Sequence, residues 1–362
     1  MHRGARRDAP AAPVGRDADA LFDGDASAQL AMARAVADAA HTLTSASVHT
    51  GSARFDGEWS LVTAQMTALG LAQVIRAHPE VRGAYLPAMR DAIDAMMRPR
   101  TWAFAVEAWG RGPFDDLASE NGHAYLGYAA LGLGALREVD PATPYAALHD
   151  RVIEALARRL ERSPTGAIET YPGEVYPCDI ASVVGAIGQH ARLTGAHRDA
   201  LLARMATLYR TRWTDADSGY LAQSVSGADG HATGEPRGSG TALASYFWSF
   251  ADASMSRALA TAIGRTGHAE FLGFGGVREY APGYAGAGDI DSGPVLFGVS
   301  VSATGFALSS SRQVGDRERF RALYRTASLF GLPVRRSGGS RFAAGGAFGN
   351  ALLFAMLTAR AP

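Results

Sequence analysis

The feature that most limits how this chain can fold is an alternation between two kinds of helical segment. One kind carries Arg and Glu on one face and Leu, Ala and Ile on the other, as in AALHDRVIEALARRLER. The other kind is nearly free of charge and rich in Gly, Ala and Ser, as in CDIASVVGAIGQHA. Amphipathic helices face solvent on one side, whereas helices that are apolar all round are buried. The alternation therefore predicts an outer layer of helices around an inner one.

The two-helix unit repeats along the chain with a period of roughly 50 to 65 residues, which is typical of repeat architectures. The uncharged helices are expected to begin near residues 58, 122, 176, 238, 291 and 343. The full set of expected helices covers 26–46, 58–77, 84–97, 122–138, 144–162, 176–194, 198–212, 238–252, 255–266, 291–311, 315–329 and 343–359. No comparable set of alternating strands is present. We therefore predict an all-α fold, a single (α/α)6 barrel (toroid) over residues 26–362, preceded by a disordered segment, residues 1–25.

Composition excludes several classes of function. The chain contains 35 basic and 35 acidic residues, and every basic residue is Arg, so chemistry that needs a lysine amine or a P-loop lysine is excluded. The balanced charge argues against nucleic-acid binding, which requires clustered cations. A single cysteine, Cys178, allows neither an internal disulfide nor a Cys-rich metal site. The histidines show no metal-ligand spacing. We expect neither a metal nor an organic cofactor.

Two further expectations concern location. The N-terminal segment is basic and rich in Pro and Ala, but no apolar stretch follows it, so it does not resemble a signal peptide. We expect a soluble, cytoplasmic protein, periplasmic only if the start site is misassigned. The uncharged segments 292–311 and 342–359 are long enough to raise the question of a membrane span. Because they are poor in Leu and Ile, buried helices explain them better, and no stable membrane span is expected.

The connections that lead into the uncharged helices are much longer than the others, and long ordered loops are usually functional. They open onto one end of the predicted barrel, at the N-termini of the inner helices, where helix dipoles favour anions. Carboxylates and aromatic side chains concentrate there, a combination that suits acid/base chemistry on a neutral organic substrate. The candidate substrate-binding residues in or beside these loops are Trp109, Asp116, Tyr171, Tyr176, Asp179, Arg237, Tyr280 and Asp291.

Each candidate also has a purely structural interpretation. The aspartates of these loops are equally explained as turn formers or helix N-caps. Cys178 could be an inert buried thiol. His123, at the start of an expected inner helix, could be a structural histidine.

The same loops and helices resemble the linalool dehydratase/isomerase family over roughly residues 71–360. The resemblance rests on GHAYLGYAALGLGAL, AIETYPGEVYPCDIASV, EPRGSGTALASYFW, VREYAPGYAGAGDIDSG and GNALLFAMLTAR. It implies an α/α toroid in which His123 matches an active-site histidine and Cys178 the second of two catalytic cysteines. Glu169 falls where the first cysteine would be, and Thr241 where the family has a tyrosine. The family's N-terminal aspartate and tyrosines have no clear match in this sequence, and Asp38 and His41 are candidates for that part of the site.

The leading hypothesis is therefore a lyase or isomerase, without cofactor, that acts on a small terpenoid-like alcohol. Glu169 would be the acid/base group, while His123 and Cys178 relay or orient. The family also forms rings, so a homo-oligomer is possible.

Two alternatives stay open. One is a carbohydrate-active toroid enzyme, a glycoside hydrolase, polysaccharide lyase or epimerase, that pairs Glu169 with Asp116 or Asp291. The other is a non-catalytic toroid that binds a ligand, in which an ion pair with Arg237 or Arg278 would occupy Glu169.

Overall fold

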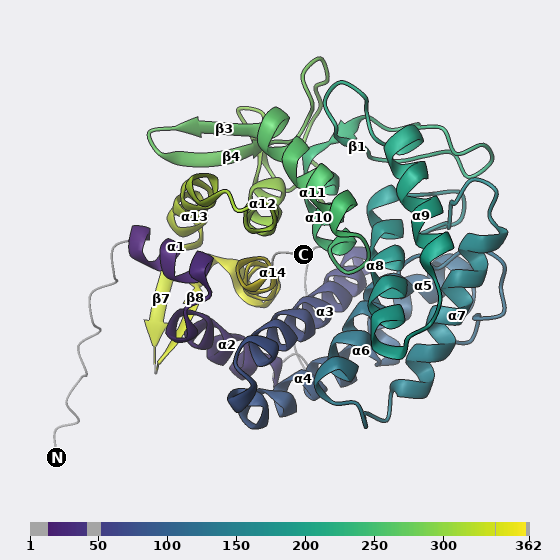
Figure 1. The fold of residues 1–362 in the computed structure, drawn as a ribbon, viewed down its shortest axis with the longest axis horizontal. Coiled ribbons are helices and arrows are strands. Elements are labelled where there is room, and N and C mark those ends of the chain that lie inside the picture. Colours follow the sequence, from purple (N-terminus) through teal and green to yellow (C-terminus); the bar gives the residue numbers. More distant parts are fainter. Residues whose placement is uncertain (1–13, 42–51, 337, 360–362) are drawn as a thin grey trace.

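The computed structural model describes residues 14–41, 52–336 and 338–359, which form two concentric rings of helices (Figure 1). Consecutive inner helices pack against one another, and the last packs against the first, so the inner ring is closed. This arrangement confirms the predicted all-α toroid. The inner ring consists of α3 (Ala53–Ala77), α6 (Leu126–Val139), α8 (Pro177–Thr194), α10 (Gly238–Trp248), α12 (Val301–Gln313) and α14 (Gly346–Thr358).

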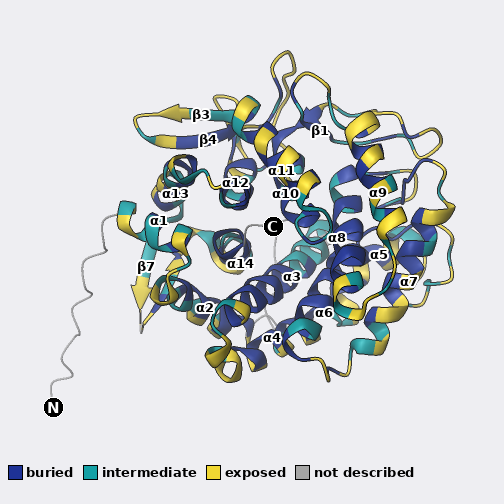
Figure 2. Ribbon diagram, viewed as in Figure 1, coloured by how far each residue is buried: buried dark blue, intermediate teal, exposed yellow. Residues whose placement is uncertain are grey.

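The outer helices cover the grooves between inner neighbours. For example, α4 packs against α3 and α6, and α11 against α10 and α12. Figure 2 shows the consequence, because the inner helices are buried over most of their length while the outer helices expose one face. The outer ring consists of α2 (Ala26–Ala40), α4 (Arg82–Met96), α7 (Ala146–Arg162), α9 (Asp199–Leu208), α11 (Ala253–Ala262) and α13 (Arg317–Gly331).

Glycine in the inner helices allows them to approach closely. A Cβ added at Gly127 of α6 would lie 2.3 Å from the Ser182 hydroxyl of α8. A Cβ at Gly185 of α8 would lie 2.5 Å from the backbone oxygen of Phe247 in α10. Such distances leave no room for a side chain, so the small residues that marked these helices in the sequence are required by the packing of the ring.

The long loops contain short elements that the helical pattern did not predict. A four-stranded sheet has the order β3-β4-β6-β5, and two smaller sheets pair β1 with β2 and β7 with β8. The strands are β1 (Leu221–Ala222), β2 (Pro236–Arg237), β3 (His268–Phe271), β4 (Phe274–Arg278), β5 (Val295–Leu296), β6 (Val299–Ser300), β7 (Pro333–Arg336) and β8 (Gly339–Phe342). The remaining short segments are α5 (Ala103–Trp109), η1 (Pro79–Val81), η2 (Pro99–Trp102), η3 (Tyr209–Trp213), η4 (Ile263–Gly267) and η5 (Ala343–Gly345).

Two expected boundaries differ from the structure. The helix expected over 291–311 begins only at Val301, because Pro294 and a tight turn at Phe297 and Gly298 divert the preceding residues into β5 and β6. Residues 14–23, inside the segment expected to be disordered, form α1 (Val14–Asp23). Its Ala18 and Leu21 are buried, and α1 packs against α13. The expected extension of α2 to residue 46, and residues 1–13, lie outside the described residues.

None of the helices in the described part of the chain combines the length and the hydrophobicity needed to cross a bilayer. The two uncharged segments of the sequence contribute α12 and α14, which have 13 residues each and belong to the inner ring. Their apolar composition is explained by contact with neighbouring helices.

The far end of the inner ring, where the helices have their C-termini, is tied together by hydrogen bonds. The side-chain amide of Gln73 in α3 donates to the hydroxyl of Tyr246 in α10 and to the backbone oxygen of Ala355 in α14, both at 3.2 Å. All three residues are buried. These hydrogen bonds join α3, α10 and α14 at the end of the ring opposite the long loops.

Candidate functional site

Glu58 lies near the start of α3, on the loop-bearing side of the ring. The hydroxyl of Tyr125 donates to its Oε1 at 2.9 Å, and the hydroxyl of Tyr171 donates to the same oxygen. The Arg54 guanidinium lies 3.5 Å from that oxygen and stacks over the Tyr171 ring. Burial raises the pKa of Glu58, and these three groups oppose the rise. Glu58 is thus a carboxyl group fixed by aromatic hydroxyls from two neighbouring segments.

Asp179 occupies the first turn of α8, next to Cys178. The hydroxyl of Tyr128 donates to its Oδ1 at 2.7 Å, and that of Thr170 donates to its Oδ2 at 2.8 Å. Burial raises the pKa of Asp179 to about 6, although both hydroxyls favour its ionised form and limit the shift; the charge of Glu58 adds to the rise. Asp179 therefore loses its proton close to neutral pH in a fixed orientation.

Asp291 lies in the loop that precedes β5 and α12; the residue is exposed at the surface, although protein atoms surround its carboxyl group closely. Within the described residues, no group donates a hydrogen bond to its carboxyl oxygens. The loss of solvation among the surrounding loops raises the pKa of Asp291 to about 7, and the charges of Asp289, Asp179 and Glu58 contribute to the rise. Because Asp291, Asp179 and Glu58 influence one another, we treat them as one group, the central carboxylates.

Aromatic side chains contact one another near the N-terminal ends of the inner helices. The rings of Trp59 in α3 and Phe348 in α14 stack with centroids 4.6 Å apart, and both residues are only half-buried. Tyr125 contacts Tyr171 edge to face at 5.2 Å and Tyr128 at 6.3 Å. Aromatic faces beside carboxyl groups suit a ligand with both apolar faces and hydroxyl groups.

The structure places His123 outside this group. Its Nε2 lies 3.2 Å from the Asp116 carboxylate, its ring contacts Trp109 at 4.8 Å, and its side chain is 1% exposed. Burial, followed by the charge of Arg159, lowers the pKa of His123 to about 4, so the ring is neutral at pH 7. With a φ of 56°, His123 adopts the left-handed conformation just before α6. These contacts hold the loop from 109 to 123 together.

Cys178 is half-buried beside Asp179, and burial, followed by the charges of Asp179 and Asp291, raises its pKa. Glu169 is also half-buried, and its backbone N–H donates to the Asn121 side chain at 3.0 Å. No ion pair involves Glu169 in the described part of the chain. The ion pair with Arg237 or Arg278, expected for a non-catalytic toroid, is therefore not formed.

Arg237 instead joins a buried network with other partners. Its Nε donates to Glu279 at 2.7 Å and its Nη1 donates to Asp289, while its guanidinium lies 5.3 Å from the Tyr280 ring. Glu279 is fully buried and also accepts a hydrogen bond from Ser239. We call Arg237, Glu279 and Asp289 the arginine clamp. Because Asp289 precedes Asp291 by two residues, the clamp fixes the loop that carries Asp291.

Thr241 is buried and bonds only to backbone groups among the contacts that the structure describes. Its hydroxyl donates to the backbone oxygen of Arg237 at 2.5 Å and accepts from the N–H of Leu221 at 2.8 Å, and the residue is fully buried. Tyr176 donates to Glu174 at 2.7 Å, at the edge of the central carboxylates. Asp38 is exposed on α2, and His41 is exposed and paired with Asp91, so both lie on the outer surface.

The structure therefore distributes the residues singled out in the sequence over three places. Tyr171, Tyr176, Cys178, Asp179 and Asp291 lie at or beside the central carboxylates; Trp109, Asp116 and His123 form the loop cluster; Arg237, Thr241 and Tyr280 belong to or adjoin the clamp. Sequence reasoning missed Arg54, Glu58, Tyr125, Tyr128 and Thr170. A signal for Glu58 exists, because it is the last acidic residue before a long uncharged stretch of an inner helix.

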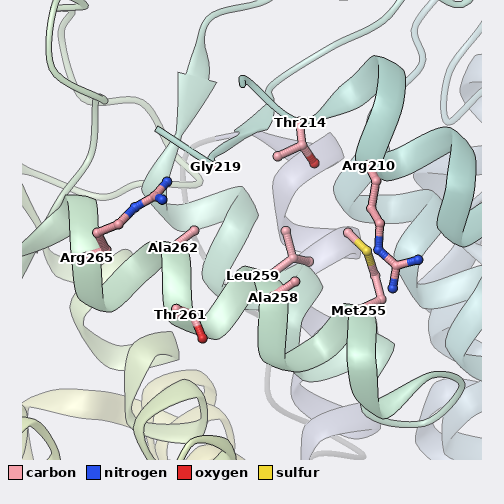
Figure 3. Close-up of a pocket in the computed structure, with 9 residues that line it drawn as sticks. All are labelled: Arg210, Thr214, Gly219, Met255, Ala258, Leu259, Thr261, Ala262 and Arg265. Carbon is pink, nitrogen blue, oxygen red and sulfur yellow. The ribbon is translucent and has the colours of Figure 1, made fainter. Parts of the chain in front are cut away.

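The described residues contain no group of three or more His, Cys, Asp or Glu side chains arranged to hold a metal ion. A cavity of about 180 Å³ lies in the outer layer, between η3 and α11 (Figure 3). Its walls include Arg210, Thr214, Met255, Leu259 and Arg265, and no carboxylate. Because the titratable groups gather at the ring centre, we place the candidate site there and not in this cavity.

The chain matches no protein-family model, and no curated protein matches it. Solved structures do match. A cellobiose 2-epimerase from Bacillus thermoamylovorans is 12% identical with a TM-score of 0.52, covering 82% of this chain and 87% of that one. An inactive α-1,6-mannanase variant of Salegentibacter sp., in complex with α-1,6-mannotriose, is 11% identical with a TM-score of 0.55, covering 95% and 99%. An unsaturated glucuronyl hydrolase specific for heparin is 10% identical with a TM-score of 0.54, covering 95% of each chain.

These matches correct the leading hypothesis from the sequence. The resemblance to linalool dehydratase/isomerase holds only for its fold, and the expected lyase or isomerase activity on a terpenoid-like alcohol is contradicted, because the matching structures are enzymes of sugars. They agree better with the carbohydrate alternative. At identities of 10–12%, what the likeness shows is the fold: the chain is an α/α toroid.

Proposed function

We propose that this protein is a carbohydrate-active enzyme that hydrolyses a glycosidic bond at the central carboxylates. The observation that carries the proposal is the presence of Asp291 and Asp179, two mutually interacting carboxyl groups with pKa values raised to about 7 and about 6, at the loop-bearing end of the ring. Glycoside hydrolases use two carboxyl groups, one protonated and one ionised. The matching toroids include enzymes named for cellobiose, α-1,6-mannan and heparin.

The two carboxyl groups have different surroundings, which suggests their roles. Asp291 accepts no hydrogen bond within the described residues and keeps its proton up to about pH 7, so it is suited to protonate the departing oxygen. Asp179 is held by the hydroxyls of Tyr128 and Thr170, which favour the ionised form. As a carboxylate it would attack the anomeric carbon or activate a water molecule. Glu58, fixed by Tyr125 and Tyr171, would bind sugar hydroxyls.

The residues first considered catalytic would take other roles. His123 is buried and neutral, so we propose that it positions the loop from 109 to 123. Cys178 would form part of the wall beside Asp179. Glu169, which is half-buried and forms no ion pair with any residue that the structure describes, would contact the substrate at the edge of the site. The hydrolase proposal fits a small-molecule sugar substrate and requires no cofactor.

The test is an assay of the purified protein on cellobiose, α-1,6-mannotriose and unsaturated heparin disaccharides, with product release followed by chromatography. Asp291→Asn should lower turnover by about 100- to 10,000-fold, the usual contribution of a general acid. The loss should be much smaller for glycosides with a nitrophenol leaving group, because such a group departs without protonation. Asp179→Asn should lose activity on both kinds of substrate.

Asp38→Asn serves as the matched control, because Asp38 is exposed on the outer ring and its loss should leave turnover unchanged. Full activity of Asp291→Asn on the natural substrate would refute the role of Asp291. If the folded protein binds sugars but turns over none of them, the non-catalytic toroid replaces the hydrolase.

A further inference from the structure

A cluster of large apolar side chains is exposed on the outer face of the molecule, at the tip of the β3–β4 hairpin and the end of α13. The exposed fractions are 76% for Phe271, 81% for Leu272 and 64% for Phe330. The cluster, which we call the apolar tip, consists of Phe271, Leu272, Phe274, Leu329, Phe330 and Leu332. Large exposed apolar patches on soluble proteins usually mark interaction surfaces.

The contacts between the hairpin and α13 show that the apolar tip is continuous. The hydroxyl of Thr326 donates to the backbone oxygen of Gly275 at 2.6 Å, and Arg325 donates to that of Gly273 at 3.1 Å. The hairpin thus follows α13 towards its C-terminus. Leu329 and Phe330 follow Arg325 and Thr326 by four residues each. They therefore lie one turn further along the same face of α13. They are uncovered because the hairpin turns back at Leu272 and Gly273.

Leu272 is unusual as a turn residue. Its φ is 51° and that of Gly273 is 82°, the left-handed geometry of a two-residue hairpin turn. Such positions favour Gly, Asn and Asp, and a branched apolar side chain is disfavoured there. Neither local conformation nor burial within the chain explains a leucine at this point.

The strand β3 provides a second, independent indication that this face is an interaction surface. Its sequence favours another copy of this chain as the partner. β3 is an edge strand, since the sheet order is β3-β4-β6-β5. Because Phe271 pairs with Phe274 across the turn, strand alternation directs the backbone groups of His268 and Glu270 away from β4. Within one chain, the imidazole of His268 lies 3.5 Å from the carboxylate of Glu270. In an antiparallel pair of two β3 strands centred on Ala269, His268 of each copy also lies opposite Glu270 of the other, so imidazoles and carboxylates alternate across the interface.

We propose that two copies of this chain associate through β3 and the apolar tip, forming a twofold symmetric dimer with a continuous sheet across the interface. The net charge of zero favours this association, because like chains do not repel one another. A twofold interface brings the same surface of both copies together, so each apolar tip is covered by its counterpart. The proposal concerns the outer face and does not depend on the proposed hydrolase activity.

The test is sedimentation velocity of the full chain over a range of concentrations. The wild-type protein should form a species of twice 37.9 kDa. Leu272→Asn, which suits the left-handed turn, should weaken association by about 10- to 100-fold, as expected for the loss of one buried leucine. The matched control is Phe297→Asn, because Phe297 is also fully exposed at a left-handed turn before a glycine, but between β5 and β6. It should leave the dimer unchanged.

A second measurement detects the strand pairing itself. Hydrogen exchange of the amides of His268 and Glu270 should slow as concentration rises in the wild type, but not in Leu272→Asn. Glu270→Arg should weaken the dimer, and the exchanged pair His268→Glu with Glu270→Arg should restore it. A wild-type monomer at every concentration, or a dimer that survives Leu272→Asn and Glu270→Arg but dissociates in Phe297→Asn, would overturn the proposal.

Discussion

Asp289 and Asp291 are two residues apart in one loop, yet their pKa values move in opposite directions. Burial opposes the charge of Asp289, but the hydrogen bonds from Arg237 and from the backbone N–H of Ser292 outweigh it and hold its pKa below the ordinary value. Among the described residues Asp291 has no such donors, and its pKa rises to about 7. The comparison teaches that one loop holds an ionised carboxylate, paired with Arg237, two residues from a carboxyl group whose pKa is raised, to which we assign the proposed catalytic role. Substitutions in the arginine clamp and substitutions at Asp291 should therefore have different effects on stability and turnover.

The largest effect on stability is expected from breaking the arginine clamp. Arg237→Met leaves the fully buried Glu279 without its charged partner, so the free energy of unfolding should fall by about 3–5 kcal/mol. Denaturant titration measures the change. The double variant Arg237→Met with Glu279→Met should recover much of it, because no charge then remains buried. Arg278→Met, at an exposed neighbouring arginine, is the control. If Arg237→Met is as stable as the wild type, the claim that the arginine clamp stabilises the fold is wrong.

Replacing either of the two aspartates should change the free energy of unfolding by less than breaking the arginine clamp does. Because the pKa of Asp289 is lowered, its contribution to stability is present above about pH 4, the ordinary value, and is lost as the pH falls through its folded pKa. Asp289→Asn should therefore lower stability at pH 7, by about 1 kcal/mol or less, since the side chain is partly exposed.

The pKa of Asp291 is shifted in the opposite direction, so its effect on stability also depends on pH in the opposite way. Its raised pKa means that stability is fully present below about pH 4 and is lost as the pH rises through about 7. Asp291→Asn should be as stable as the wild type near pH 4 and more stable at pH 8. Thermal unfolding of both variants at these pH values tests the contrast. Equal behaviour of the two variants would contradict it.

The smallest effect concerns the pH dependence of turnover. Activity should require Asp179 ionised and Asp291 protonated, and so be highest between about pH 6 and 7. Tyr128→Phe removes a donor that favours ionised Asp179, so the acidic limb of the pH–rate profile should move upward by about one pH unit or less. Tyr176→Phe is the control, because that hydroxyl donates to Glu174. A downward shift of the acidic limb would contradict the assignment of Asp179.

The fold was largely predictable from the sequence, because an inner helix must be apolar on all sides and glycines such as Gly127 are required by its packing. The site was less predictable. Asp179, Asp291 and Tyr171 all interact with Glu58, but their place in a functional site stays a prediction. Glu58 was missed because it lies on a helix and not in one of the long loops. The burial of His123 depends on a left-handed turn and on Trp109, neither of which helical periodicity reveals.

The hydrogen bonds of Gln73 at the far end of the inner ring determine how a polymer could meet this protein. Gln73, Tyr246 and Ala355 are buried and join three inner helices at that end, so under the proposed function a polysaccharide would not thread through the ring. A chain end or a short oligosaccharide would instead reach Asp179 and Asp291 from the loop-bearing end. If the protein hydrolyses such a substrate, the cleaved sugar would leave by the path that the next substrate uses, so each turnover would release the chain and accumulating product would inhibit the reaction.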